Sequence, residues 1–511
     1  MREMTAGSTV GICARDYAGR FDETRHRATP VTGNCRESDR GLVFICLIQR
    51  RFFWRLFCFV RTMKTHLDWS AYDTYGVGDA YAGIPATGGN YAKAVAVCMN
   101  NHQCQREGKG VMCPSYRITH DPAHSTGARV KAFKAALNGE LGEYPFTHPD
   151  LAAAMDLCVS CKGCKKECPS AVDMTLIKTE YLAQKNEREG ISLRTRLFAG
   201  LPRWLHRWRR PLAALVRWRN ASPAVARLAE FWLGLAASRP IPPLAERSFV
   251  MPPAEPAEAA ETRGKVLLFV DTFSHHYTPE VAEAAVKVLR AGGYRVDILR
   301  PAPGDREPER PLCCGRTYLS QGLVEAARIE ARRVMAALAP ALAEGTPIVG
   351  LEPSCLLALR DEFYSLSLGP EVGQLGKQAF LFEEFLMREG NKGLKLPLTP
   401  MPGGRAVIHG HCHQKAFAAR KAVRKVLGWI PEFEFDIVEA SCCGMSGSFG
   451  LEAEHYGASQ AMGELALLPA VRAAPADAPI VADGFSCRHQ IKDGTGREAE
   501  HVAVLLARAL G

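Results

Sequence analysis

The stretch "CVSCKGCKKECPS", Cys158 to Ser170, places four cysteines in the spacing C-x2-C-x2-C-x3-C and follows the last with a proline. Ferredoxin-type proteins use this spacing to hold a [4Fe–4S] cluster, and in two-cluster members the fourth cysteine ligates the other cluster. Zinc is the competing metal, but its sites are usually built from paired C-x2-C units. The spacing therefore favours iron–sulfur over zinc, and the helical patterns around it predict an all-helical, ferredoxin-like domain.

An earlier stretch, "CMNNHQCQREGKGVMCPSY" (98–116), has the same outer spacing but carries Asn101 where the middle cysteine is expected. Cross-ligation predicts one complete [4Fe–4S] site from Cys113, Cys158, Cys161 and Cys164. A second cluster would use Cys98, Cys104 and Cys168, as a [3Fe–4S] cluster or as a [4Fe–4S] cluster with Asn101, water or another group on one iron. The alternative is that this second site holds no cluster.

Composition supports this interpretation of the cysteines. The chain has 511 residues, enough for about three domains, and 18 cysteines, many of them in tight groups. Adjacent cysteines and C-x2-C pairs suit metal chelation better than mutual disulfides, and no secretory signal is visible. The sequence therefore predicts a reducing, cytoplasmic location, with peripheral contact at the inner face of the membrane as a further expectation.

The N-terminal part of the chain divides into four predicted segments. Residues 1–65 form an atypical leader that we expect to be disordered, and Met63 is an alternative start. Residues 67–185 hold both cysteine stretches among helical patterns. Residues 186–238 are a basic, tryptophan-rich helical segment, and the Pro/Ala/Glu-rich residues 239–264 predict a linker.

Charge within the basic segment indicates its partner class. Residues 190–220 hold eight arginines and no acidic residue, interleaved with Trp204, Trp208 and Trp218. This pattern fits an interfacial amphipathic helix and also a helix docked on a partner subunit. The net charge of +10 is concentrated locally rather than spread over the chain, so we expect no nucleic-acid partner.

From residue 265 the apolar pattern changes to short runs that alternate with helical stretches, which predicts a parallel α/β sheet. The pattern occurs twice, at 265–390 and at 400–511, and each copy contains a CCG sequence and a later third cysteine. The predicted fold class is therefore α + α/β, a helical ferredoxin-like domain followed by a two-copy α/β domain. We call these copies the first and second CCG segments.

The two copies differ in their metal-ligating residues. The second CCG segment offers a full set of four, Cys412, Cys442, Cys443 and Cys487. The first offers three, Cys313, Cys314 and Cys355. We therefore expect the metal or iron–sulfur site chiefly in the second segment, with shape or extra ligands from the first. The nearby histidines could be ligands, proton carriers or ordinary loop residues, and they are His275, His276, His409, His411 and His413.

Several of these motifs resemble known families. "CCGRTYLS", "GLEPSC", "HGHCHQKA" and "CCGMSGSFG" resemble the cysteine-rich CCG domains of the heterodisulfide reductase B subunit and the glycolate oxidase iron–sulfur subunit. "MCPSYRITHDPAHSTGAR" with "DLCVSCKGCKKECP" resembles the C-terminal iron–sulfur half of FAD-linked D-2-hydroxyacid dehydrogenases, of the D-lactate or D-2-hydroxyglutarate type. The resemblance covers about residues 67–511.

The resemblance implies a function in electron transfer. In that family, an FAD domain oxidises a 2-hydroxyacid, and electrons leave through the iron–sulfur half to an acceptor such as a quinone. This chain has no long glycine-rich flavin region, so the resemblance implies FAD on a partner dehydrogenase subunit. Two alternatives stay open: a stand-alone disulfide or acceptor reductase of the heterodisulfide reductase type, and a zinc-binding structural protein.

Overall fold

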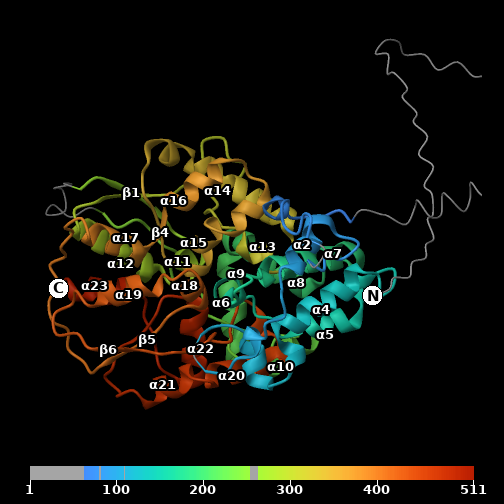
Figure 1. The fold of residues 1–511 in the computed structure, drawn as a ribbon. Coiled ribbons are helices and arrows are strands. Elements are labelled where there is room, and N and C mark those ends of the chain that lie inside the picture. The colour runs from blue at the N-terminus through green and yellow to red at the C-terminus, as the bar shows by residue number, and fades with distance from the viewer. Residues whose placement is uncertain (1–62, 80–81, 109, 254–262) are drawn as a thin grey trace, which may run out of the picture. The chain divides into compact units, whose positions relative to one another are not determined.

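The computed structural model describes residues 63–79, 82–108, 110–253 and 263–511 (Figure 1). Apart from residues 63–65, the predicted leader lies outside this described part. Residues Thr62–Gly511 form one compact unit, and all contacts below lie within it. In Figure 1, helices α4, α5 and α7 lie on one side of this unit and the strands β1, β5 and β6 lie on the other.

The N-terminal part of this unit is helical, as the sequence predicts. Local signals begin the helices: Ser125 accepts a hydrogen bond from Ala128 N at the start of α4, and Asp173 accepts one from Leu176 N at the start of α7. The helices are α2 (Gly89–Ala96), α3 (Pro114–Thr119), α4 (Thr126–Leu137), α5 (Pro149–Asp156), α6 (Gly163–Glu167) and α7 (Met174–Glu189).

The basic, tryptophan-rich segment is also helical, in α8 (Leu193–Ala199), α9 (Leu201–Ala221) and α10 (Pro223–Leu233). Helix α9 bends at Trp208, whose φ of −130° is not helical, because Pro211 three residues later cannot complete the helical hydrogen-bond ladder. Among the described residues, no helix is long and apolar enough to cross a membrane. Two buried residues, Arg239 and Phe249, lie in the first part of the predicted linker.

The first CCG segment is built on a four-stranded parallel sheet of order β2-β1-β3-β4. Its strands are β1 (Lys265–Phe269), β2 (Arg295–Ile298), β3 (Ile348–Gly350) and β4 (Ala379–Leu381). Its helices are α11 (Thr272–His276), α12 (Pro279–Ala291), α13 (Arg316–Leu319), α14 (Val324–Glu344), α15 (Pro353–Leu359), α16 (Glu371–Gln378) and α17 (Phe382–Gly390). The short apolar runs "GKVLLFVD", "YRVDILRP" and "TPIVGLEP" predict the first three strands, but no such run predicts β4.

The second CCG segment repeats this plan on a three-stranded parallel sheet of order β6-β5-β7. Its strands are β5 (Ala406–His409), β6 (Phe435–Ile437) and β7 (Ile480–Ala482). Its helices are α18 (Cys412–Ala416), α19 (Arg420–Leu427), α20 (Tyr456–Glu464), α21 (Leu467–Ala473), α22 (Phe485–Thr495) and α23 (Val502–Ala509). Strand β1 pairs with β2 and β3, and strand β5 pairs with β6 and β7. Strand β1 therefore corresponds to β5, and β3 corresponds to β7.

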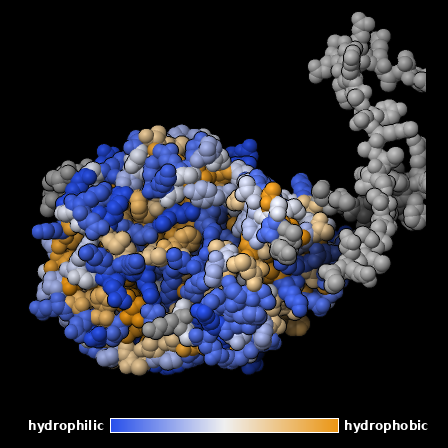
Figure 2. Space-filling model, viewed as in Figure 1, coloured by the Kyte–Doolittle hydropathy of each residue, from blue (hydrophilic) through white to orange (hydrophobic). Residues whose placement is uncertain are grey.

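Apolar cores join the segments to one another. One cluster of buried side chains contains both Phe133 of α4 and Phe269 of β1, and a second contains Val266 of β1 and Ile408 of β5. A third places Cys161 among the cysteines of the second CCG segment. On the face drawn in Figure 2, hydrophobic residues form patches within a mostly hydrophilic surface. The buried apolar contacts therefore hold the cysteine-bearing loops of different segments against one another.

Candidate metal centre and cavity

The four cysteines predicted to hold the first cluster lie together. Thr126 Oγ1 lies 3.0 Å from Cys113 Sγ and 2.9 Å from Cys164 Sγ. The charges of Cys113 and Cys158 both act on the buried Cys161 thiol. The chain between the two motifs, residues 117–157, contains no cysteine and includes helices α4 and α5. The fold of these helices brings Cys113 to the later motif.

A buried arginine adjoins this group. Arg129 Nη1 donates to Cys113 Sγ over 3.8 Å, and Arg129 is only 2% exposed. A hydrogen bond from the Cys164 thiol lowers the pKa of Cys113; burial opposes this, but the charge of Arg129 and a bond from Thr126 bring the pKa to about 6. Because the thiolate is the metal ligand, this environment prepares Cys113 for ligation.

The loop that carries Asn101 has left-handed residues at the same two positions as the loop that carries Cys161. In the later loop, Ser160 and Lys162 have φ of 49° and 60°. The residues at the same positions of the earlier loop, Asn100 and His102, have φ of 52° and 56°. Such left-handed conformations are uncommon for residues other than glycine. The earlier loop therefore shares these two left-handed positions with the later loop, and Asn101 stands at the position of the missing cysteine.

Two cysteines of the second predicted cluster are also neighbours. Gly127 N donates to Cys104 Sγ over 3.3 Å, and the charge of Cys98 is among the influences on the Cys104 thiol. Burial is the main cause that raises the pKa of Cys104. Cys98 and Cys168 are partly buried against the apolar core that contains Cys104. This group is thus closer to the surface than the first.

The second CCG segment gathers all four of its cysteines. The Cys442 thiol interacts with Cys412 and Cys443, and Cys443 interacts with Cys487. Hydrogen bonds from Cys442 and Cys487 hold the pKa of Cys443 well below its usual value. Beside Cys443 lies His409, which is buried and whose two ring nitrogens have no hydrogen-bond partner in the described part. The unpaired ring and the four thiols fit a metal or iron–sulfur site.

The first CCG segment gathers three cysteines. The Cys314 thiol interacts with both Cys313 and Cys355. Thr272 begins α11 as Cys412 begins α18, so a threonine stands where the second segment has its fourth cysteine. A hydrogen bond from the Cys314 thiol lowers the pKa of Cys355. Burial and the carboxylates of Asp271 and Glu352 outweigh this hydrogen bond and raise the pKa to about 12.

Of the histidines named from the sequence, His411 and His413 lie near the cysteine groups, whereas His275 and His276 contact another part of the chain. His411 caps α18 by accepting from His413 N, and His413 Nε2 lies 3.3 Å from Ser160 O. His275 and His276 contact the chain around residues 245–249 instead: Phe249 N donates to His275 O, and Ser248 Oγ lies 3.1 Å from His276 Nδ1. The position beside the three cysteines of the first CCG segment is therefore filled by Thr272.

A cavity of about 510 Å³ joins these groups, and we call it the cysteine cavity. It is lined by cysteines of all three segments: Cys158, Cys313, Cys314, Cys355, Cys412, Cys442 and Cys443. Cys161 and Cys412 are close enough for the charge of Cys412 to raise the pKa of Cys161, after the larger effect of burial. Ser446 Oγ donates to Val159 O over 2.5 Å. The ferredoxin-type loop and the second CCG segment are thus in direct contact.

Two charged residues of the CCG motifs lie between the CCG segments: Arg316 of "CCGRTYLS" and Glu352 of "GLEPSC". Arg316 pairs with Glu362, its Nη2 lies 3.4 Å from His413 Nε2, and the charges of Cys314 and Cys412 both act on it. Glu352 Oε2 accepts from Phe485 N over 2.7 Å. The contacts of Arg316 with His413 and of Glu352 with Phe485 join residues about 100 or more positions apart, so no local sequence signal could have identified them.

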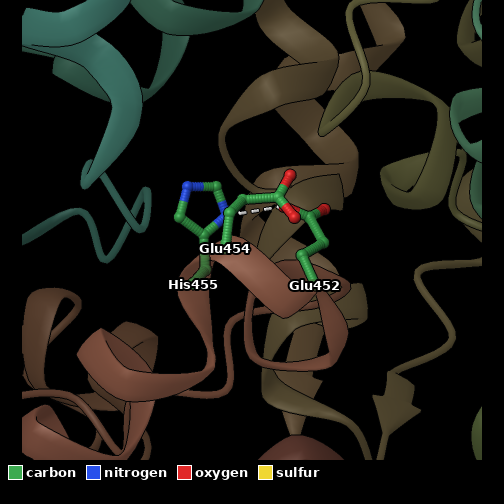
Figure 3. Close-up of side chains that lie close together, drawn as sticks. All are labelled: Glu452, Glu454 and His455. Carbon is green, nitrogen blue, oxygen red and sulfur yellow. Dashed lines mark hydrogen bonds and ion pairs between the residues drawn. The ribbon is translucent and has the colours of Figure 1, made fainter. Parts of the chain in front are cut away.

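A different cluster lies at the rim of this cavity. The carboxylates of Glu452 and Glu454 lie close to the His455 ring (Figure 3), and the three ligand atoms are within 4.8 Å of one another. These groups already have partners: His455 contacts Glu452 and Asp156, and Arg194 pairs with Glu454. The cluster is therefore accounted for as an ion-pair network.

Comparison with protein families identifies residues 94–172 as a 4Fe-4S dicluster domain. Both ferredoxin-type stretches lie inside this match. No solved structure is detectably similar to the chain.

Three curated relatives extend the similarity. One of the subunits of anaerobic glycerol-3-phosphate dehydrogenase from Escherichia coli (strain K12) is 29% identical over 260 residues, covering 50% of this chain and 61% of the relative. D-2-hydroxyglutarate dehydrogenase of the same strain is 24% identical over 448 residues, covering 78% of this chain and 42% of the relative. Lactate utilization protein A of Geobacillus thermodenitrificans is 26% identical over 198 residues, covering 37% of this chain and 75% of the relative.

The chain therefore spans less than two thirds of the first two relatives. The similarity to dehydrogenase proteins agrees with the family that the motifs suggest. The chain carries a 4Fe-4S dicluster domain and is similar to the iron–sulfur half of FAD-linked D-2-hydroxyacid dehydrogenases.

Proposed function

We propose that the chain is an iron–sulfur electron-transfer subunit. It receives electrons from FAD on a partner dehydrogenase subunit that oxidises a 2-hydroxyacid, and it passes them to an acceptor such as a quinone. The observation that carries this proposal is that Cys161 and Cys412 lie in one buried cluster, where the ferredoxin-type loop meets the second CCG segment. Bound iron–sulfur clusters would supply the one-electron chemistry.

The residues of this chain would hold the clusters and set their environment. Cys113, Cys158, Cys161 and Cys164 would hold the first, and Cys412, Cys442, Cys443 and Cys487 would hold the centre of the second CCG segment. Backbone N–H groups at Gly127, Gly315 and Gly444 donate to cysteine sulfurs over 3.3–3.4 Å. Such bonds and the surrounding apolar core tune reduction potentials.

The test is anaerobic purification of the full chain from its native host, with iron, sulfide, zinc and flavin analysis and identification of co-purifying chains. We expect iron and sulfide in this chain, a co-purifying flavoprotein, and bleaching of the visible cluster absorbance when a 2-hydroxyacid is added to the complex. Zinc without iron or sulfide would contradict the proposal, and so would 2-hydroxyacid oxidation by this chain alone.

A second candidate is a disulfide or acceptor reductase that works in the cysteine cavity. Cys442, Cys443 and His411 line this cavity, which favours a reaction there. The two functions differ in the effect of Cys442→Ser: for either function it should slow transfer to the acceptor, but only a disulfide reductase would also lose measurable disulfide cleavage. Wild-type protein that cleaves no disulfide excludes that form of the second candidate.

A further inference from the structure

A second cavity, of about 620 Å³, lies outside the cysteine cavity, between α9 and α13. Its outer wall includes exposed residues of α9, among them Arg203, Trp204 and Arg207, so it opens to the surface. Its inner wall includes Tyr318 of α13, which is only 5% exposed. This volume is in the range of pockets that bind small molecules. We call it the α9–α13 cavity.

Helix α13 separates the two cavities. Arg316, Thr317 and Ser320 line the cysteine cavity, whereas Tyr318 lines the α9–α13 cavity. Tyr318 follows the Cys313–Cys314 pair by only four residues, and Cys313 lies near enough for its charge to act on the tyrosine. A ligand in the α9–α13 cavity would therefore be separated from the thiols of the first CCG segment only by helix α13.

The tyrosine hydroxyl lacks a partner. Tyr318 Oη is buried and forms no hydrogen bond with any described residue. An unpaired buried hydroxyl is costly, and such a group calls for a hydrogen-bond partner. Because burial, with a smaller effect of Glu330, raises the pKa of Tyr318 to about 12, the phenol is neutral near pH 7 and can donate.

The surface beside the cavity indicates what kind of molecule enters. Large apolar side chains are exposed along α8 to α10, and those on residues 193–232 are Leu193, Leu197, Trp204, Trp208, Leu215, Trp218, Leu228, Phe231 and Trp232. Exposed tryptophan with arginine is typical of an interface between water and an apolar phase. The ligand should thus combine an apolar tail with a flat head group that accepts hydrogen bonds and can stack on Trp204.

We propose that the α9–α13 cavity binds the head group of a lipid quinone, with Tyr318 donating to one carbonyl, Arg203 or Arg207 near the other, and Trp204 against the ring. The inference rests on the proposed function, because it places the electron acceptor of that function. The reaction would add two electrons and two protons to the quinone and give the quinol. The electrons come from the partner flavin through this chain, and the protons come from water at the open side.

The first experiment measures binding alone, so it does not depend on the partner. A ubiquinone analogue with one isoprenoid unit is titrated into the anaerobic full chain by calorimetry. We expect Tyr318→Phe to weaken binding roughly fivefold, the effect of one lost hydrogen bond. Trp204→Ala should weaken it roughly tenfold by removing the aromatic contact. The matched controls Tyr364→Phe and Trp232→Ala alter exposed rings outside the cavity and should bind as the wild type does.

The second experiment measures electron transfer. The chain is reduced with dithionite, and its reoxidation by the quinone analogue or by ferricyanide is followed by visible absorbance. We expect Tyr318→Phe and Trp204→Ala to slow reoxidation by quinone at low concentration but not by ferricyanide, which also shows that the variants are folded. Unchanged quinone affinity in both variants would overturn the cavity assignment. Failure of ferricyanide to reoxidise the chain would instead contradict the proposed electron-transfer function.

Discussion

At the scale of single residues, His455 predicts a pH dependence of stability. Burial lowers its pKa, but hydrogen bonds and charges from Asp156 and Glu452 outweigh burial and raise the pKa to about 9. Because the folded-state pKa lies above the unfolded value of about 6.5, the stabilisation is fully present below pH 6.5 and is lost as the pH rises through about 9. His455 of the second CCG segment contacts Asp156 of α5, so the ion pair of these two residues also holds two parts of the unit together.

The change that tests this is His455→Gln, which keeps a hydrogen-bonding side chain but cannot be charged. The variant should be less stable than the wild type by on the order of 2 kcal/mol at pH 6, with the gap closing towards pH 10. Urea unfolding of the anaerobic protein at pH 6, 8 and 10 measures the gap. His120→Gln is the matched control, since His120 and its partner Glu107 are exposed. A gap that is the same at all three pH values would contradict the assignment.

A second prediction at this scale concerns the pairing of cysteines between the two motifs. Cys113→Ser should remove the same cluster as Cys164→Ser, because both sulfurs contact Thr126. Cys168→Ser should match Cys98→Ser instead. Each of the first two variants should lose about four iron atoms per chain. Iron analysis and paramagnetic resonance of the reduced protein compare the four variants, and a loss shared by Cys113→Ser and Cys98→Ser alone would contradict the cross-ligation.

At the scale of elements, a buried charge network fixes the ferredoxin-type loop to the first CCG segment. Lys162 has a fully buried side chain and pairs with Asp361 and Glu362. Asp361→Asn should destabilise the protein by about 3–5 kcal/mol, because it breaks a buried ion pair. Asp297→Asn removes a more exposed ion pair and should cost less than about 1 kcal/mol. Denaturant midpoints measure both, and equal costs would contradict the structural role of the network.

The local sequence predicts the individual helices and strands, whereas it does not predict the tertiary contacts between them. Short apolar runs such as Lys265–Phe269 and Ala406–His409 predict parallel strands, and the structure has them. Strand β4 runs directly into α17 at Phe382 with no turn residue between them, so its apolar residues do not stand out from the helical pattern. The ion pair of Lys162 with Asp361 spans 199 positions, and the contact of Arg316 with His413 spans 97. Contacts at such separations depend on the whole fold, so the site could be predicted as cysteine groups but not as one cavity.

At the scale of the whole molecule, the basic, apolar face of α8–α10 predicts attachment to anionic membranes. Trp208 and Trp218 are 50% and 61% exposed, and residues 190–220 contain no acidic side chain to oppose anionic lipid. Tryptophan favours the bilayer interface, and each basic residue adds about 1 kcal/mol at an anionic surface. The full chain should therefore sediment with vesicles that contain anionic lipid, less with neutral vesicles, and less as salt increases.

Substitutions on this face distinguish membrane contact from docking on a protein partner. Trp208→Ser with Trp218→Ser should weaken vesicle binding roughly tenfold or more, since both rings would leave the interface. Tyr364→Ser, an exposed aromatic residue in the first CCG segment, is the matched control and should bind as the wild type does. Loss of flavoprotein co-purification without loss of vesicle binding would show that this face binds the partner subunit instead. Equal sedimentation of both variants and the wild type would likewise contradict membrane attachment through α8–α10, and quinone would then have to reach the α9–α13 cavity from another side.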